Sequence, residues 1–571
     1  MTRDPKTYRS AKWFADPGKL GHTSRERIHQ IGASREDFMG KPVIGILSTW
    51  SEMNPCHIHF RERAEDVKRG VWQAGGFPVE IPVLSLGEPF MKPTTMIYRD
   101  LMSAEVEEVL VCHPLDGAVL MGGCDKTPAA MLMGALSASI PSVFLPSGPM
   151  LSGEWRGTRL GSGTDLNKAH DALKRGEIGA QALVDMETGG ARSAGHCMTM
   201  GTASTMCSIA EAMGMCPAGS SSIPAPDSRH RAMAAQVGRI AVDLVRRDVR
   251  PEMILGADAF HNAIVTLMAL GGSTNAVIHL MAMADRAGVP LELEDFGRLS
   301  ETVPVLADIR PSGEYLMEDF HRAGGVPALL DRIRDHLRLA APTVTGRSLG
   351  EEIAAAECFD DRVIRPRDEP VIDNGGLVVL RGNLAPGGAV LKRSAATPAL
   401  LKNRGKAICF NSRADVNARI DDPSFELDET TVLVLKYAGP KGVGLPEWGM
   451  LPLPKRLAER GVKDLVRLSD ARMSGTHYGT VVLHITPEAA DGGPLALVED
   501  GDWITLDADA GTLTLEVSDE ELARRRAAWT PPHFEDKRGW AAFYRREARS
   551  ASDGAGVEFL AGSDRRKDPL M

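Results

Sequence analysis

The sequence predicts an α/β protein, with an N-terminal parallel α/β domain followed by a β-barrel-like C-terminal domain. Up to about residue 165, short apolar strand-like runs alternate with helical segments, which is typical of a parallel sheet. A helical stretch follows. Beyond a mixed, charged segment at 340–372 the chain changes to short strands separated by turn residues. We therefore expect an N-terminal domain at 1–370 and a C-terminal domain at 371–571.

The individual elements follow from the same patterns. Strands of the first domain are expected at 42–50, 77–86, 118–121 and 142–146, with helices at 59–74 and 95–109. The longer helices of the middle part are expected at 229–247 and 257–270. Strands of the second domain are expected at 376–381, 406–410, 430–437, 464–468, 479–485 and 503–517, before a charged helix at 518–526. Residues 1 to about 35 are polar and are expected to form an irregular arm.

Composition excludes several classes of function. The 571 residues carry a net charge of −10, which argues against nucleic acid as the main partner. No apolar run reaches the roughly 18 residues of a membrane span, and the N-terminus lacks an apolar signal core. The eight cysteines are scattered and form no Cys-x-x-Cys pair, which argues against a disulfide framework and zinc ribbons. We expect a cytoplasmic protein without membrane or nucleic-acid partners.

The densest chemistry lies in the turn after the strand at 118–121. Cys124, Asp125 and Lys126 follow two glycines, and Thr127 is the expected N-cap of the next helix. Strand-to-helix turns are where active sites of α/β proteins collect. A helix N-terminus favours the thiolate, which is the metal-binding form of cysteine. The alternative interpretation is a buried cysteine beside a solvated Asp–Lys pair.

Two further cysteines, Cys56 and Cys197, also precede helices, so three thiols from distant loops can converge on one metal centre. Zinc would normally need a fourth protein ligand. Three cysteines on an iron–sulfur cluster would leave one iron with an open position. The alternative for each cysteine is a small buried hydrophobic residue.

Hard oxygen ligands are also available. Glu88 lies at the end of a predicted strand and Glu447 in a turn-rich loop of the second domain. Together with Asp125 they are the ligand type that Mg²⁺ takes beside substrate and water. Soft and hard sites together suit the dehydration of a hydroxy acid. Taken alone, Glu88 reads as a solvated loop carboxylate, and Ser474, between small residues before a strand, reads as a turn serine.

Six motifs carry a resemblance to the dihydroxy-acid and sugar-acid dehydratases, the family that also includes phosphogluconate dehydratase. The resemblance covers nearly the whole chain, and the motifs are specific only in combination. They are Asn54-Pro-Cys56, Gly123-Cys-Asp-Lys-Thr127, His196-Cys-Met-Thr-Met-Gly-Thr-Ala-Ser-Thr205, Gly271-Gly-Ser-Thr-Asn-Ala276, Gly439-Pro-Lys-Gly442 with Glu447, and Asp470-Ala-Arg-Met-Ser-Gly475.

The resemblance implies a fold, two cofactors and a set of site residues. It implies an α/β N-terminal domain and a swivelling, β-barrel-like C-terminal domain in a homodimer or homotetramer, with the site between the domains. A 2Fe–2S cluster would be bound by Cys56, Cys124 and Cys197. Mg²⁺ would be bound by Glu88, Asp125, Glu447 and a carbamylated Lys126, since carbamylation gives lysine a carboxylate-like group. Thr199 and Thr476, which stand within or beside these motifs, are candidate substrate-binding residues.

The same resemblance implies a reaction. Mg²⁺ would hold the carboxylate and C2 hydroxyl of a 2,3-dihydroxy acid, Ser474 as an alkoxide would take the C2 proton, and the open iron would accept the C3 hydroxyl. The product would be a 2-keto-3-deoxy acid and water. Asp470-Ala-Arg-Met-Ser-Gly475 and the segment at 312–319 resemble the arabinonate and xylonate dehydratases.

Three alternatives stay open. The substrate could instead be 2,3-dihydroxyisovalerate of branched-chain amino-acid synthesis, or the enzyme could act on both kinds of acid. The protein could be a non-catalytic iron–sulfur redox sensor, against which the missing fourth cysteine and the three carboxylates argue. It could also be a plain binding protein with buried cysteines.

Overall fold

A four-stranded parallel sheet forms the centre of the N-terminal domain. In the computed structural model, which describes residues 3–534 and 537–565, the strand order is β2-β1-β3-β4. All four expected strands are present: β1 Val43–Ser48, β2 Phe77–Pro82, β3 Gly117–Gly122 and β4 Ser142–Pro146. Strands β1, β3 and β4 are buried along their whole length, so both faces must be covered, which is typical of a parallel sheet.

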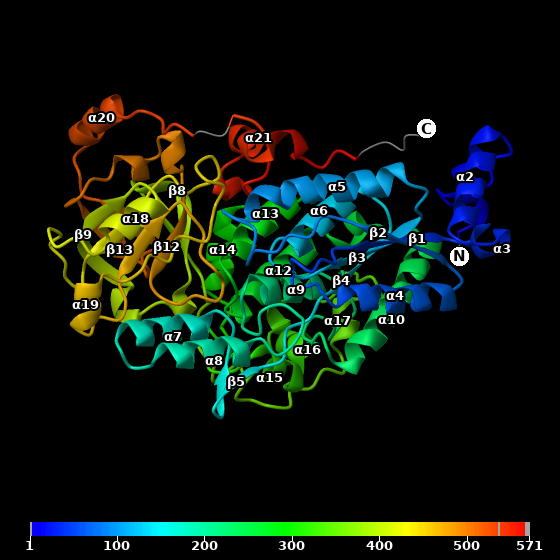
Figure 1. The fold of residues 1–571 in the computed structure, drawn as a ribbon, viewed down its shortest axis with the longest axis horizontal. Coiled ribbons are helices and arrows are strands. Elements are labelled where there is room, and N and C mark those ends of the chain that lie inside the picture. Colours follow the sequence, from blue (N-terminus) through cyan, green and yellow to red (C-terminus); the bar gives the residue numbers. More distant parts are fainter. Residues whose placement is uncertain (1–2, 535–536, 566–571) are drawn as a thin grey trace.

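Helices cover both faces of this sheet. Figure 1 shows α5 (Arg99–Cys112) and α6 (Thr127–Ala138) on one side and α4 (Phe60–Gln73) and α10 (Ser228–Arg247) on the other. In the sheet, β2 lies on one side of β1, and β3 lies on the other side. The strand order therefore reverses between β1 and β3, which is the topological switch point of the sheet. Ligands of open α/β sheets bind beyond the carboxyl ends of the strands at such a point. The loops that carry Cys56 and Cys124 leave β1 and β3 there.

The middle of the chain is helical, as expected. Its longer helices are α7 Thr164–Lys174, α8 Ala180–Gly190, α9 Thr202–Ala212, α12 Ala257–Ala269 and α13 Asn275–Ala287. A two-stranded hairpin, β5 Gly153–Trp155 and β6 Thr158–Leu160, was not predicted, because each strand is only three residues long. The smaller helices are α14 Leu293–Ser300, α15 Met317–Arg322 and α16 Gly325–Arg332.

The C-terminal domain contains a closed eight-stranded barrel in the order β10-β11-β12-β8-β7-β14-β13-β9. Its strands are β7 Val378–Gly382, β8 Ala385–Leu391, β9 Lys402–Phe410, β10 Val432–Leu435, β11 Val466–Ser469, β12 Val481–Thr486, β13 Trp503–Asp507 and β14 Thr512–Leu515. The barrel confirms the expected fold class. Two details were wrong: β8 was missed, and the single strand expected at 503–517 is the antiparallel pair β13–β14.

The two domains share apolar contacts. The barrel interior has its own core, but Val390, Met473 and Leu483 of the second domain belong to the large core of the first. The chain also returns to the first domain after the barrel. Helix α21 (Trp540–Glu547), drawn in red in Figure 1, lies over the α/β domain, and Trp540 Nε1 donates to the Ile97 carbonyl at 2.6 Å.

The expectation of an irregular N-terminal arm was wrong. Helices α1 Ala11–Phe14, α2 Lys19–Gln30 and α3 Arg35–Phe38 occupy this segment, and Figure 1 shows α2 at the edge of the molecule beyond β1 and β2. Among the described residues, no helix combines the length and the hydropathy that crossing a membrane requires. The charged helix expected at 518–526 is present as α20 Asp519–Ala528.

Candidate active site between the two domains

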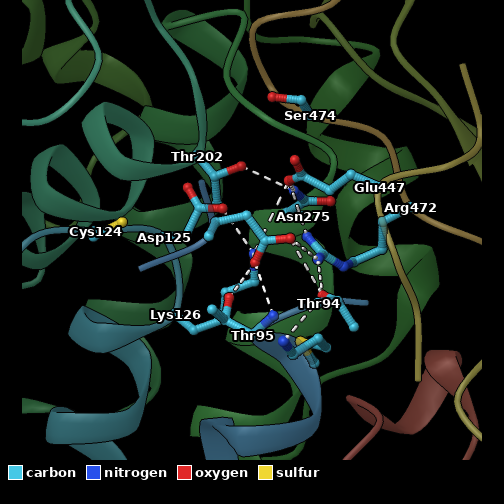
Figure 2. A network of polar contacts seen from close by, with 12 residues as sticks. Thr94, Thr95, Cys124, Asp125, Lys126, Thr202, Asn275, Glu447, Arg472 and Ser474 are labelled. Atoms are coloured by element: carbon cyan, nitrogen blue, oxygen red, sulfur yellow. Dashed lines mark hydrogen bonds and ion pairs between the residues drawn. The ribbon is translucent and has the colours of Figure 1, made fainter. Parts of the chain in front are cut away.

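Loops from both domains meet around the side chain of Lys126. The N-terminal domain contributes the loops after β2 and β3 and the first turns of α9 and α13, and the barrel domain contributes the loops after β10 and β11. Figure 2 shows the side chains of Lys126, Asn275, Glu447 and Arg472 pointing toward one another. The turn after β3 is close to the predicted one, but α6 begins at Thr127 with Lys126 as its N-cap residue, and the Thr127 hydroxyl accepts from Gly123 N at 2.9 Å.

Three carboxylates surround the buried ammonium of Lys126. Its Nζ lies 2.7 Å from Asp125 Oδ2, 2.9 Å from Glu88 Oε2 and 4.0 Å from Glu447 Oε1. Burial and Arg472 lower the pKa of Lys126, but the three carboxylates raise it by more, so the pKa is shifted upward overall. The four residues for which the resemblance implies a Mg²⁺ site are therefore brought together.

The two glutamates have opposite pKa shifts. Burial disfavours the charge of Glu88, but Lys126 and Arg472 outweigh it and lower its pKa to about 2. Glu447 is farther from the ammonium, so burial and the charge of Glu88 raise its pKa to about 7. Glu88 is also held by backbone and side-chain hydrogen bonds from Thr95. Of the two, Glu447 is the carboxylate that takes up a proton.

Arg472 is a site residue that sequence reasoning missed. Its side chain is fully buried, its Nε donates to the Leu445 carbonyl at 2.8 Å, and its Nη1 lies 3.4 Å from Glu447 Oε1. Its Nη2 donates to Thr94 Oγ1 of the other domain at 3.0 Å. Arg472 stands two positions before Ser474 in a motif that the sequence singled out, but the motif does not say that the guanidinium faces the carboxylates.

Asn275, at the start of α13, is a second missed residue. Its Nδ2 lies 2.8 Å from Thr202 Oγ1, 3.2 Å from the Met473 carbonyl and 3.4 Å from Glu447 Oε1. Two of these partners can only accept, which fixes the orientation of the amide. Asn275 thus joins the start of α9 to both barrel loops. Asn275 belongs to the motif Gly271-Gly-Ser-Thr-Asn-Ala276 that the sequence singled out, but the motif did not indicate these contacts.

Ser474 lies in the loop after β11, half-buried, with its Oγ 3.0 Å from Thr476 Oγ1. The loop packs tightly on the N-terminal domain: a Cβ on Gly475 would be 2.7 Å from Thr202 N, and Thr164 Oγ1 donates to the Thr476 carbonyl at 2.6 Å. Ser474 and Thr476 are therefore neighbours at the domain interface. Thr199 is buried nearby, but its hydroxyl bonds the Ser162 carbonyl at 3.4 Å and not Ser474.

Two of the three candidate cysteines are neighbours. The Cys56 thiol lies within hydrogen-bonding reach of the Cys124 thiol, and this contact together with burial raises the pKa of Cys124. Burial raises the pKa of Cys197 to about 12, with a further contribution from Cys124. The expectation that a helix N-terminus would favour the thiolate was wrong for Cys124, because the contact with Cys56 and the burial of the thiolate charge outweigh the helix dipole.

Within residues 3–534 and 537–565, no three Cys, His, Asp or Glu side chains are arranged as a ready-made metal site. The carboxylates are drawn to the Lys126 ammonium, and the Cys56 thiol contacts the Cys124 thiol. The donors nevertheless fall into two separate sets by chemistry, with oxygen atoms around Lys126 and sulfur atoms at the ends of β1 and β3. The Lys126 ammonium lies at the centre of the oxygen set, so the three carboxylates already surround a positive charge.

His57 was not singled out as a site residue, yet it is buried between the two sulfur loops. Its Nε2 accepts the backbone N–H of Cys124 at 2.8 Å. Burial lowers the pKa of His57 to about 3, so the ring is neutral. Its signal in the sequence was its position directly after Cys56, in the segment Cys56-His-Ile-His59 that departs from the arabinonate dehydratases that the chain resembles.

Two domain families of known proteins match this chain. Residues 41–352 match the dihydroxy-acid/6-phosphogluconate dehydratase N-terminal domain, and residues 362–555 match the corresponding C-terminal domain. Together the two matches cover most of the chain. They also include every residue described above as part of the site.

Similarity to individual dehydratases extends over nearly the full length. The chain is 52% identical to 6-deoxy-6-sulfo-D-gluconate dehydratase of Pseudomonas putida over 98% of both chains. It is 47% identical to L-arabinonate dehydratase of Rhizobium leguminosarum bv. trifolii, over 98% of this chain and 97% of that protein. It is 39% identical to a dihydroxy-acid dehydratase of Caldicellulosiruptor saccharolyticus, over 94% and 97%. The resemblance found in the motifs is confirmed: the chain belongs to the dihydroxy-acid/6-phosphogluconate dehydratase family.

Proposed function

We propose that this protein is a hydro-lyase that converts a sugar acid with hydroxyl groups at C2 and C3 into a 2-keto-3-deoxy acid and water. The observation that carries the proposal is the convergence of Glu88, Asp125 and Glu447 on Lys126, beside the Ser474 loop and the three thiols. Identity favours a sugar acid, because the relatives at 47% and 52% are named for sugar acids and the dihydroxy-acid dehydratase stands at 39%.

The oxygen donors fit a divalent cation such as Mg²⁺, which prefers carboxylates, substrate and water. The misfit is the Lys126 ammonium, which has the charge of a cation and no lone pair to donate. Carbamylation removes the misfit: the neutral amine bonds to CO₂, a proton is released, and the product is an anionic carbamate. We therefore propose that Glu88, Asp125, Glu447 and carbamylated Lys126 hold Mg²⁺.

The sulfur donors fit an iron–sulfur cluster better than zinc. Cys56, Cys124 and Cys197 are three cysteines, one ligand fewer than a structural zinc site usually takes. The raised pKa values of Cys124 and Cys197 make these buried thiols costly to ionise, so they suit a cationic iron centre that stabilises thiolates. When bound, Mg²⁺ and cluster iron supply Lewis acidity toward carboxylate and hydroxyl oxygens of a substrate.

The residues of the chain have distinct tasks in this reaction. Ser474, as the alkoxide, takes the C2 proton, and Thr476 hydrogen-bonds its oxygen. Loss of the C3 hydroxyl with a proton gives water and an enol, which tautomerises to the 2-keto acid, so atoms balance without an external oxidant. A serine is a weak base at its usual pKa, so nearby positive charge has to favour its ionised form.

The test is turnover by the anaerobically purified protein on a panel of acids. The panel contains pentonates, hexonates, 6-deoxy-6-sulfogluconate and 2,3-dihydroxyisovalerate, and the readout is 2-keto acid formed with and without Mg²⁺. We expect Mg²⁺-dependent product from at least one sugar acid and weaker turnover of dihydroxyisovalerate. Preference for dihydroxyisovalerate would support the branched-chain alternative instead. No product from any acid, in protein that contains iron and sulfide, would contradict the proposal.

The Lys126→Arg variant tests carbamylation. Arginine keeps a positive charge among the carboxylates, so the fold should survive, but its guanidinium does not form a carbamate under these conditions. We expect wild-type activity to fall when CO₂ and bicarbonate are removed and to return when they are restored. The variant should be inactive at every bicarbonate concentration. A variant that retains turnover would remove Lys126 from the Mg²⁺ site.

We further propose that the enzyme is cytoplasmic and a homodimer or homotetramer, as its family resemblance implies. All eight cysteines are unpaired in the structure, which fits a reducing compartment. The small-molecule acid is then its only required partner.

A further inference from the structure

His57 connects the two loops that carry Cys56 and Cys124. It follows Cys56 directly, lies fully buried, and its Nε2 is 2.8 Å from the backbone nitrogen of Cys124. Because an amide nitrogen can only donate, Nε2 is the acceptor and carries no hydrogen. The ring also stacks on Phe60, with centroids 5.0 Å apart and planes at 26°. The stacking on Phe60 therefore fixes the plane of the imidazole, and the hydrogen bond from Cys124 fixes its orientation within that plane.

The hydrogen of the neutral ring must be on Nδ1, and it has an acceptor. Thr49 Oγ1 lies 2.9 Å from Nδ1, and the Thr49 hydroxyl donates to the Met121 carbonyl at 2.7 Å, so its oxygen is free to accept from the ring. A chain of three hydrogen bonds therefore runs from Cys124 N–H through His57 and Thr49 to Met121 O. This series of hydrogen bonds joins Met121, at the end of β3, to Cys124, in the turn that follows β3.

Asn54 supports the same assignment. Its Nδ2 is placed 3.1 Å from His57 Nδ1 and 3.1 Å from Ser85 Oγ, while its Oδ1 is buried without a partner. Rotating the amide by 180° puts the oxygen against the Nδ1 hydrogen and removes a donor–donor contact. Either Asn54 or Thr49 then accepts from His57.

The Cys124 amide is shared with one more acceptor. Thr127 Oγ1 lies 3.1 Å from Cys124 N, and its hydroxyl donates back to the Cys124 carbonyl at 3.0 Å. The contact with His57 is the shorter of the two, and it is the one that comes from another loop. Thr127 therefore shapes the turn locally, whereas His57 ties the turn to the neighbouring strand.

We propose that His57 is a positioning residue of the sulfur site: it sets the approach of Cys124 to Cys56 and holds the Cys124 amide away from the bound cluster. This inference rests on the proposed iron–sulfur cluster. Groups that orient ligands without touching the metal tune both affinity and potential. Freeing the amide would offer a new N–H donor to a sulfur atom, which stabilises the more negative, reduced cluster and so raises its reduction potential.

The test compares four variants by iron content, electron paramagnetic resonance of the reduced cluster, midpoint potential, and the rate of iron loss to a ferrous chelator. His57→Leu keeps bulk but removes the acceptor, and we expect an altered resonance spectrum, a more positive potential and roughly 10-fold faster iron loss. His57→Gln can accept from Cys124 and donate to Thr49, so it should restore most of the wild-type behaviour.

Two further variants separate positioning from a general effect on folding. Thr49→Val removes the second and third links but leaves the Thr49 carbonyl, 3.2 Å from His57 Nδ1, as an acceptor. We therefore expect a shift in the same direction but smaller than that of His57→Leu. His59→Leu is the matched control: His59 is a buried histidine of the same loop whose Nε2 lies 2.9 Å from the Ser147 carbonyl, not from Cys124. It should leave the resonance spectrum and the potential unchanged.

The outcomes are distinguishable. Wild-type values in both His57→Leu and Thr49→Val would overturn the positioning role while leaving the cluster itself in place. If His57→Leu does not fold, a wild-type spectrum and potential in Thr49→Val would have the same meaning. A wild-type protein that never binds iron and sulfide would overturn the proposed cluster and, with it, this role of His57.

Discussion

Arg472 of the barrel domain donates a hydrogen bond to Thr94 of the α/β domain at 3.0 Å, and the same guanidinium faces Glu88 and Glu447. All the carboxylates of the site are thus paired with a cation from one domain or the other. Buried ionic groups are stable only when they are paired and hydrogen-bonded. Arg472 therefore both joins the two domains and balances the negative charge of the site.

Removing the Arg472 charge should destabilise the protein. Arg472→Leu leaves Glu447 with the distant Lys126 as its only cation, and losing one partner of a buried pair costs about 3–5 kcal/mol. Arg472→Lys keeps the charge but not the planar fork, so its loss should be smaller. The free energy of unfolding in urea gives the comparison. Arg175→Leu, at an exposed ion pair with Glu177, should not shift the unfolding midpoint. An Arg472→Leu protein as stable as wild type would contradict the pairing.

Replacing Ser474 should separate catalysis from cofactor binding. Ser474→Ala removes the proposed base but no ligand, so kcat should fall by about 10²–10⁴-fold while iron content and the visible spectrum stay as in wild type. Thr476→Val removes the hydrogen-bond partner of Ser474 and should have a smaller effect. Ser518→Ala, at the cap of α20, controls for loss of a serine hydroxyl elsewhere. Retained turnover in Ser474→Ala would assign the base to another group.

Asn275 should matter for kcat because it contacts both barrel loops of the site. Asn275→Asp keeps the size of the side chain but places a negative oxygen against the Met473 carbonyl and Glu447, which repels both barrel loops. A displacement of about 1 Å at a reacting group can cost about 100-fold in rate. Steady-state kinetics should show this as a fall in kcat larger than any rise in KM. Asn403→Asp, whose amide bonds the Thr430 carbonyl in the barrel, is the control and should keep wild-type kinetics. Equal kinetics of Asn275→Asp and wild type would show that the contacts of Asn275 with the barrel loops do not position the reacting groups.

Glu488 should make stability depend on pH. It is buried beneath the Gly439–Gly442 loop and accepts from Lys441 N and Gly442 N, and burial together with Asp470 raises its pKa from 4.5 to about 8. The folded protein therefore binds this proton more tightly than the unfolded chain does. The stabilisation that it contributes is complete below pH 4.5 and is lost as the pH rises to about 8.

Glu488→Gln removes this titration with little change of shape. Each unit of pKa shift corresponds to about 1.4 kcal/mol, so the variant should be more stable than wild type at pH 9 by at least that amount. At pH 5 the difference should be much smaller. Urea unfolding at the two pH values measures both. If the two proteins differ equally at pH 5 and pH 9, the charge of Glu488 is not the cause.

Local sequence patterns determined most of the fold. The apolar runs of β1 and β3 are bounded by turn residues and were found in place, and so were the long amphipathic helices. The misses have local causes. Strand β8 contains Pro386, Gly387 and Gly388, which mask its strand character, and the turn between Asp507 and Thr512 divides what reads as one strand. In the N-terminal arm, frequent charges hid helix α2.

The sequence by itself also determined which chemistry is available, because Cys124, Asp125 and Lys126 are consecutive and each side chain has a known affinity for metals or acids. Only the tertiary structure decided how these groups meet. The pairing of Arg472 with Glu88, 384 positions apart along the chain, leaves no periodic signal. The raised pKa values of Cys124 and Cys197 have the same origin. The helix dipole is a local property that a sequence reveals, whereas the contact with Cys56 and burial exist only once the folded chain has packed around these thiols.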